Sequence, residues 1–216
     1  MRFIYLHGFA SGPQSGKAQF FLRQFAARGV VLEIPNLVEG EFEDLTITGQ
    51  LQVLERIAKN EPVCLIGSSM GGYLAALYAS RHSEAQKLVL LAPAFQFVQR
   101  WPQEIGPDKA EEWERTGQFE VFHYAEGQPR NIGWNLIADG RKYDAEPSFT
   151  QPAIIFHGTS DIVVPSDYSV AFAARHPNVA LRLMASDHQL TDVTQAIWEE
   201  MAPFLLDSPL HRATLP

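Results

Sequence analysis

The sequence of 216 residues contains a single cysteine, Cys64, which excludes a disulfide within the chain. It has no apolar run near the ~20 residues that a membrane-spanning helix needs. Positive charge is scarce, because 17 Lys and Arg stand against 25 Asp and Glu and give a formal net charge of −8. This balance argues against nucleic acid as a partner. It does not exclude an anionic substrate, because local charge can differ from net charge.

The apolar run at the N-terminus, residues 3–6, is too short and too quickly interrupted to predict a secretory leader. A cytoplasmic location is therefore expected. Cys64 lies inside an apolar stretch and is expected to be a buried core thiol rather than a nucleophile or ligand. No pattern in the sequence requires a metal ion or an organic cofactor, and the oligomeric state stays open.

What the sequence does contain is an alternation of strand and helix patterns. Continuous apolar runs predict strands at residues 3–7, 30–34, 63–67, 87–91, 153–157 and 180–184. Helical patterns cover residues 15–28, 47–59, 73–82, 166–175 and 190–206. Continuous runs are typical of strands covered on both faces. The sequence therefore predicts an α/β fold, with a mostly parallel, doubly wound sheet of about six strands, in a single domain over residues 1–216.

The alternation breaks between residues 94 and 152, a segment rich in aromatic residues and proline. It is too long for a simple crossover and too aromatic for a disordered linker. We expect a small inserted cap over the carboxyl ends of the strands. The alternative is a crossover helix with decorated loops, whose aromatic side chains pack into the main core. Residues 207–216 are expected to be poorly ordered.

The most informative motif is Gly67-Ser68-Ser69-Met70-Gly71, which follows a predicted strand and precedes a predicted helix. A G-x-S-x-G motif in this context predicts a nucleophile elbow. Ser69 would then have a strained backbone with positive φ and project its hydroxyl above the sheet edge. The alternative is a glycine-rich turn that only connects strand and helix.

A serine hydroxyl needs a general base, and that base needs an orienting acid. Asp161 lies in the turn after the predicted strand 153–157, and His188 follows the last strand. Their chain order after Ser69 is the one expected for a strand–elbow–helix fold. His7 and His157 also lie at carboxyl ends of strands, where supporting roles are expected. Asp187 is a poor orienter of its neighbour and is expected to cap the following helix instead.

An acyl-transfer site also needs donors for the developing oxyanion. The N–H of Met70, directly after Ser69, is one expected donor. The N–H of Phe9, in the glycine-containing loop after the first strand, is the other. The alternative is a loop that makes no such contact.

Taken together, these motifs resemble the α/β-hydrolase superfamily over almost the whole chain. The matching stretches are 6–9, 67–72, 157–161 and 187–188. Within the superfamily, residues 6–9 followed by 11–15 and Lys17, together with 67–73, are similar to the small bacterial YqiA-like esterases. The resemblance implies hydrolysis of carboxylic esters, with Ser69 as nucleophile, Asp161 as acid and His188 as base. Segment 94–152 matches no motif of the family.

Three hypotheses follow from these residues. The first is a serine hydrolase that cleaves carboxylic esters of small molecules through an acyl-enzyme. The second is an acyl coenzyme A thioesterase on the same triad, in which Arg130, Arg141 and Lys142 contact phosphates; the alternative for these residues is solvated surface charge. The third is a non-catalytic binding protein on a hydrolase scaffold.

Overall fold

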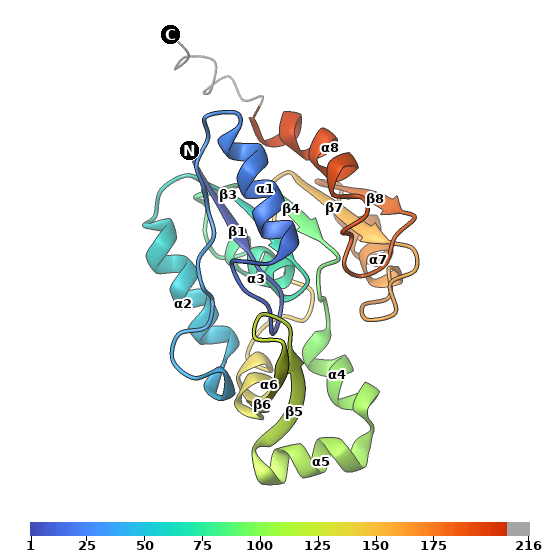
Figure 1. Ribbon diagram of the computed structural model, residues 1–216. Coiled ribbons are helices and arrows are strands. Elements are labelled where there is room, and N and C mark those ends of the chain that lie inside the picture. Colours follow the sequence, from blue (N-terminus) through green and yellow to red (C-terminus); the bar gives the residue numbers. More distant parts are fainter. Residues whose placement is uncertain (207–216) are drawn as a thin grey trace.

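A six-stranded parallel sheet forms the centre of the protein in the computed structural model, which describes residues 1–206 (Figure 1). Its order is β2-β1-β3-β4-β7-β8. The strands are β1 (Arg2–Leu6), β2 (Leu32–Glu33), β3 (Val63–Ser68), β4 (Ala85–Leu91), β7 (Ala153–Gly158) and β8 (Val179–Met184). Every neighbouring pair is parallel, which confirms the predicted doubly wound α/β sheet. The prediction for residues 207–216 lies outside the described residues.

Helices cover both faces of this sheet (Figure 1). On one face lie α1 (Gly16–Ala26) and α8 (Thr194–Leu206), and on the other lie α2 (Ile47–Ala58), α3 (Met70–Ala79) and α7 (Asp167–Arg175). Phe25 of α1 packs against Trp198 of α8, with ring centroids 5.2 Å apart. The two resulting cores explain why the central strands are apolar along their whole length. Across residues 1–206, no helix has the length and apolar character needed to cross a bilayer.

Several predicted boundaries are wrong. The strand predicted at 30–34 shrinks to Leu32–Glu33, since Val31 is largely exposed at the sheet edge. The helix predicted at 73–82 begins at Met70, directly after Ser69, and ends at Ala79. The helix predicted at 190–206 begins only at Thr194, because Leu190 adopts a left-handed φ of 53° that no α-helix continues.

Segment 94–152, hereafter the insertion, forms its own substructure beyond the carboxyl ends of the central strands (Figure 1). It contains α4 (Phe97–Ile105), α5 (Pro107–Thr116), the antiparallel hairpin β5 (Gln118–His123) and β6 (Gln128–Gly133), and α6 (Asn135–Gly140). Trp113 is its buried centre and donates through Nε1 to the carbonyl of Ile132 over 3.0 Å. A neighbouring ring, Trp101, lies 5.2 Å from Phe9 in the loop after β1. The insertion thus packs against the sheet edge that carries Ser69.

A short 3₁₀ turn, η1 (Phe42–Asp44), completes this contact. Its Phe42 ring lies 5.4 Å from Phe9 and 4.6 Å from the ring of His123 at the end of β5. The loop after β1 is therefore held between the long β2–α2 connection and the insertion.

Candidate active site

Ser69 occupies a sharp turn between β3 and α3, with φ 54° and ψ −117°. The neighbouring glycines make this turn sterically accessible. A Cβ on Gly67 would lie 2.2 Å from the carbonyl oxygen of Gly71, and one on Gly71 would lie 2.1 Å from that of Leu6. Only glycine fits such close approaches of backbone to backbone. The strained φ at Ser69 is the conformation that the elbow motif predicts.

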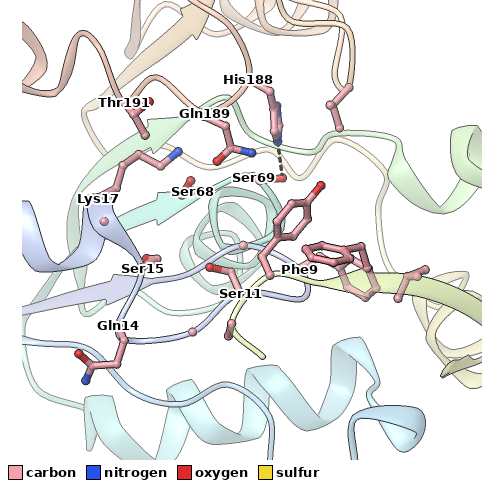
Figure 2. A pocket seen from close by; sticks show the side chains of 18 of the residues that line it. Phe9, Ser11, Gln14, Ser15, Lys17, Ser68, Ser69, His188, Gln189 and Thr191 are labelled. Carbon is pink, nitrogen blue, oxygen red and sulfur yellow. Dashed lines mark hydrogen bonds between the residues drawn. The ribbon is translucent and has the colours of Figure 1, made fainter. Parts of the chain in front are cut away.

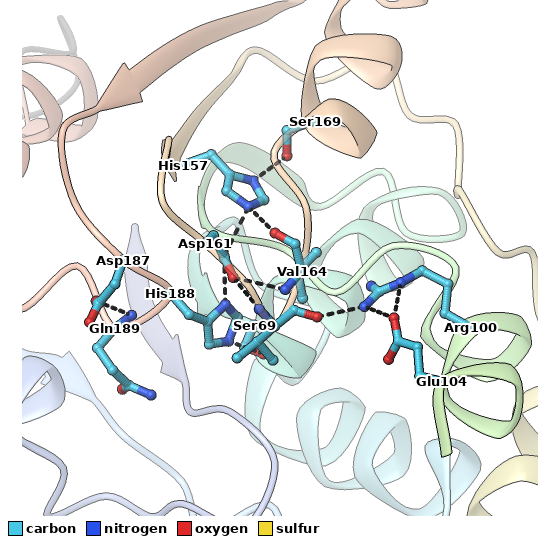
Figure 3. A network of polar contacts seen from close by, with 11 residues as sticks. Ser69, Arg100, Glu104, His157, Asp161, Val164, Ser169, Asp187, His188 and Gln189 are labelled. Atoms are coloured by element: carbon cyan, nitrogen blue, oxygen red, sulfur yellow. Dashed lines mark hydrogen bonds and ion pairs between the residues drawn. The ribbon is translucent and has the colours of Figure 1, made fainter. Parts of the chain in front are cut away.

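The three side chains chosen from the sequence are hydrogen-bonded in series (Figure 3). His188 lies in the loop after β8 and Asp161 in the turn after β7. Ser69 Oγ lies 3.1 Å from His188 Nε2, and His188 Nδ1 lies 2.7 Å from Asp161 Oδ2. With Nδ1–H donating to the carboxylate, Nε2 is free to accept the serine proton. The fold thus brings together residues that are 119 positions apart in the chain.

The Asp161 carboxylate is buried and receives four hydrogen bonds. Its Oδ1 accepts from the N–H groups of Val163 and Val164, over 2.9 and 2.8 Å, and its Oδ2 accepts from His157 and His188. Burial opposes ionisation, but the bonds from the two histidines and from Val164 outweigh it and hold the pKa of Asp161 well below its usual range. Asp161 is therefore a fixed anion at neutral pH.

His157, at the end of β7, is the second histidine on this carboxylate. Its side chain is fully buried, and its Nε2 lies 3.0 Å from Asp161 Oδ2 and 2.8 Å from the carbonyl oxygen of Val164. Both partners are acceptors, so Nε2 must carry a proton. Its Nδ1 lies 2.7 Å from the hydroxyl of Ser169 in α7. His157 ties the Asp161 turn to the helix behind it.

His7 holds the loop after β1 in place, as His157 holds the Asp161 turn. Its Nε2 accepts from the N–H of Leu37 over 3.2 Å, so its Nδ1 carries the proton and donates to the carbonyl of Gly8 over 3.0 Å. Burial lowers the pKa of His7, which favours this neutral form. The peptide between Gly8 and Phe9 is planar and trans, so its N–H points away from His7.

The Gly8 backbone lies against Ser69, because a Cβ on Gly8 would be 3.4 Å from the Cβ of Ser69. Among residues 1–206, neither the N–H of Phe9 nor that of Met70 donates to a protein acceptor. Met70 is the first residue of α3, whose N-terminus carries partial positive charge. Phe9 and Met70 thus offer two N–H groups without an acceptor among the described residues, one directly after Gly8, whose backbone lies against Ser69, and one directly after Ser69 itself.

A pocket of about 720 Å³ opens above Ser69 and His188 (Figure 2). One part of its wall is aromatic and combines Phe9 with four side chains of the insertion: Trp101, Phe119, Phe122 and Tyr124. The other part is polar and includes Ser11, Gln14, Ser15, Lys17, Gln189 and Thr191. Sequence reasoning missed this polar wall, because nothing in the pattern of α1 shows that Lys17 faces inward.

The three cations expected to contact coenzyme A phosphates lie outside this pocket. Arg130 pairs with Glu43 and Glu126, Lys142 pairs with Asp139, and Arg141 packs over the ring of Trp134. None of these three cations lines the pocket. Cys64 is buried, as predicted, and burial raises the pKa of its thiol to about 11.

The expected helix-capping role of Asp187 is wrong. Its carboxylate accepts from the N–H of Gln189 over 2.8 Å within the loop, and α8 begins only at Thr194. Among the described residues, no group of three or more His, Cys, Asp or Glu side chains is arranged to hold a metal ion.

Comparisons with known proteins identify the family and the fold. Residues 2–205 match the model of an uncharacterised protein family, UPF0227. No curated protein sequence matches the chain significantly. The fold is similar to that of mouse alpha/beta hydrolase domain-containing protein 10, with TM-score 0.76, 20% identity, and coverage of 94% of this chain and 90% of that one.

Two further solved structures share the fold. Est1E from Butyrivibrio proteoclasticus, solved with ferulic acid bound, has TM-score 0.76 and 23% identity, covering 93% of this chain and 87% of that one. Monoacylglycerol lipase from Paleococcus ferrophilus has TM-score 0.66 and 15% identity, covering 92% and 93%. The expected resemblance is confirmed: the chain belongs to the UPF0227 family, and its fold is that of the α/β hydrolases.

Proposed function

We propose that the protein is a serine hydrolase that cleaves carboxylic esters of small molecules through an acyl-enzyme. The observation that carries the proposal is the bridging position of His188, which is hydrogen-bonded to Ser69 Oγ at 3.1 Å and to Asp161 Oδ2 at 2.7 Å. A nucleophile, a base and an orienting acid in this relation are what acyl transfer to serine requires. The similarity of the fold to an esterase and a lipase supports the same class.

The steps follow from the positions of these atoms. Ser69 Oγ attacks the ester carbonyl while His188 Nε2 takes its proton, and Asp161 stabilises the resulting imidazolium. The N–H groups of Phe9 and Met70 bind the oxyanion. His188 then protonates the leaving alcohol, which departs and leaves Ser69 acylated. Water, deprotonated by the same imidazole, attacks the acyl-enzyme and releases the acid.

The insertion acts as the cap in this proposal, because its aromatic side chains form much of the pocket wall. A thioester would be cleaved by the same groups. The proposal places esters first, since Arg130 and Lys142, two of the cations expected to meet coenzyme A phosphates, are paired with acidic neighbours. A purely binding function is disfavoured by the complete hydrogen-bonded series from Ser69 to Asp161.

The test is turnover of p-nitrophenyl butyrate by the wild type, Ser69→Ala and Ser83→Ala. Ser83 is an exposed serine outside the pocket and serves as the matched control. We expect Ser69→Ala to lose at least about 10³-fold in kcat, since the nucleophile is absent. A fluorophosphonate probe should label the wild type and Ser83→Ala only. Retained turnover or labelling in a folded Ser69→Ala protein would refute the assignment.

A further inference from the structure

Lys17 is the one lysine, arginine, aspartate or glutamate among the described residues that line the pocket. The residue is 8% exposed, yet its ammonium group forms no hydrogen bond or ion pair within the described range 1–206, and the carboxylates of Asp187 and Asp161 act on it only from a distance. Figure 2 shows its side chain directed into the pocket, on the side of Ser69 where Gln189 and Thr191 lie. A largely buried lysine without a hydrogen-bonded partner is costly, so such side chains normally have a counter-charge in contact.

The backbone around Lys17 provides further donors. Lys17 is the second residue of α1, an 11-residue helix whose first turn contains no acidic side chain. The N-cap residue Ser15 makes no side-chain capping bond. The N–H groups of Gly16, Lys17 and Ala18 have no acceptor among the described residues. A helix start of this kind favours an anion, because its free N–H groups and the helix dipole both point there.

The two walls of the pocket suit different chemical groups of a substrate. Gln189 and Thr191 lie on the Lys17 side of the pocket (Figure 2), and no carboxylate of the described residues lines it. Aromatic side chains line the other side. Ser69 and His188 lie between the two walls (Figure 2). A molecule that fits both walls carries an apolar group and a negatively charged group on opposite sides of its scissile bond.

We propose that Lys17 and the N-terminus of α1 form a binding subsite for an anionic oxygen group, a carboxylate or phosphate, carried by the ester substrate. This inference rests on the proposed esterase function and names its substrate class: esters that are anionic on one side and apolar on the other. Burial lowers the pKa of Lys17 to about 8 although the charges of Asp187 and Asp161 raise it, which agrees with an ammonium group that has no counter-charge in direct contact in the free protein.

Two pairs of substrates, each an anionic ester and a neutral one, test the subsite on either side of the ester; only the first pair is isosteric. On the acyl side, mono-p-nitrophenyl adipate is compared with p-nitrophenyl 6-methylheptanoate, in which two methyl groups replace the carboxylate oxygens. On the leaving-group side, 3-carboxy-4-nitrophenyl butyrate is compared with p-nitrophenyl butyrate. The readout is the ratio of kcat/KM for the anionic ester to that for its neutral partner, at constant ionic strength and pH 7.

We expect this ratio to be about 10-fold or more in the wild type for at least one pair, the size of a charge-assisted hydrogen bond in a site with little water. In Lys17→Met the ratio should fall at least about 10-fold, and in Lys17→Arg it should be partly kept. Lys109→Met, which removes an exposed lysine of α5, should leave it unchanged. A wild type without preference in either pair, or a preference that survives in Lys17→Met, would overturn the proposal.

A measurement of ligand binding tests the anion subsite independently of esterase activity. The thermal midpoint of wild type and Lys17→Met is measured with adipate, inorganic phosphate or chloride at equal ionic strength. Adipate or phosphate should raise the midpoint of the wild type alone, and the stronger of the two identifies the group. If no ester is hydrolysed but this shift is seen, the esterase proposal fails and the anion subsite stands. If esters are hydrolysed and no shift is seen, the subsite is refuted.

Discussion

His157 shares a carboxylate oxygen of Asp161 with His188: its Nε2 lies 3.0 Å from Oδ2, and His188 Nδ1 lies 2.7 Å from the same atom. The first contact is fully buried and the second faces the pocket. Asp161 is thus oriented from behind by one imidazole while it orients the other. Rotation of the carboxylate would break a bond to His157 as well as one to His188.

Replacement of His157 by Phe keeps a buried ring but removes both nitrogen contacts. We expect kcat for p-nitrophenyl butyrate to fall about 10-fold or more with a smaller change in KM, because Asp161 is less well fixed. Ser169→Ala is the control, since it removes the bond to Nδ1 and leaves Asp161 untouched. It should cost about 1 kcal/mol of stability with little change in kcat. Equal kcat losses in both variants would contradict a positioning role.

The strained backbone of Ser69 predicts that the side chain needed for activity lowers the stability of the protein. With φ 54° and ψ −117°, this residue adopts a conformation that glycine tolerates better than alanine. Ser69→Gly and Ser69→Ala should both be inactive, and the glycine variant should be more stable by about 1 kcal/mol. For a chain of this size the difference corresponds to about 2–4 °C in thermal midpoint, measurable by calorimetry. An alanine variant as stable as the glycine variant would show that the turn is unstrained.

The close packing at the elbow predicts that alanine at Gly71 destabilises the protein far more than alanine at Gly16, which lies in α1. A Cβ on Gly71 would lie 2.1 Å from the carbonyl oxygen of Leu6, whereas one on Gly16 would meet nothing within 4 Å. We expect Gly71→Ala to lose several kcal/mol or fail to fold, because backbone must move apart at the sheet. Gly16→Ala should be neutral or slightly stabilising. Urea unfolding of both variants checks this; a mild loss for Gly71→Ala would contradict the packing described here.

Burial lowers the pKa of Lys17 from its ordinary 10.5 to about 8, which predicts a pH dependence of stability. Between pH 8 and 10.5 the unfolded chain holds this proton and the folded chain does not, so the contribution of Lys17 to stability rises with pH. The full rise is about 3 kcal/mol. Below pH 8 Lys17 is charged in both states and the contribution is constant.

Lys17→Met has no titrating group at this position. The difference in unfolding free energy between variant and wild type therefore reports the contribution of Lys17 alone. The stability advantage of Lys17→Met over the wild type, from urea unfolding, should be largest near pH 7 and shrink toward pH 10. An advantage independent of pH would show that Lys17 is solvated in the folded protein.

Much of the site could be predicted because its residues lie in local patterns. Strand, G-x-S-x-G and helix place Ser69, and apolar strands followed by polar turns place Asp161 and His188. Lys17 belongs to the motif that the sequence shares with its family, but its place in the pocket could not be predicted in this way, since it depends on how α1 packs against the sheet. Neither could the hairpin β5–β6, because the exposed Glu120 and the partly buried Arg130 interrupt the apolar run that marks the other strands. Leu190 carried no signal for a left-handed turn, so the start of α8 was placed too early.

The order of the strands has a consequence for synthesis of the protein. The nucleophile follows β3 in the middle of the sheet, but His188 follows β8 at the far edge. A nascent chain on the ribosome can therefore form the elbow well before the residue that activates it has been translated. The hydroxyl of Ser69 stays chemically inert until the last strand docks, so a covalent serine probe added to stalled nascent chains would report completion of the sheet.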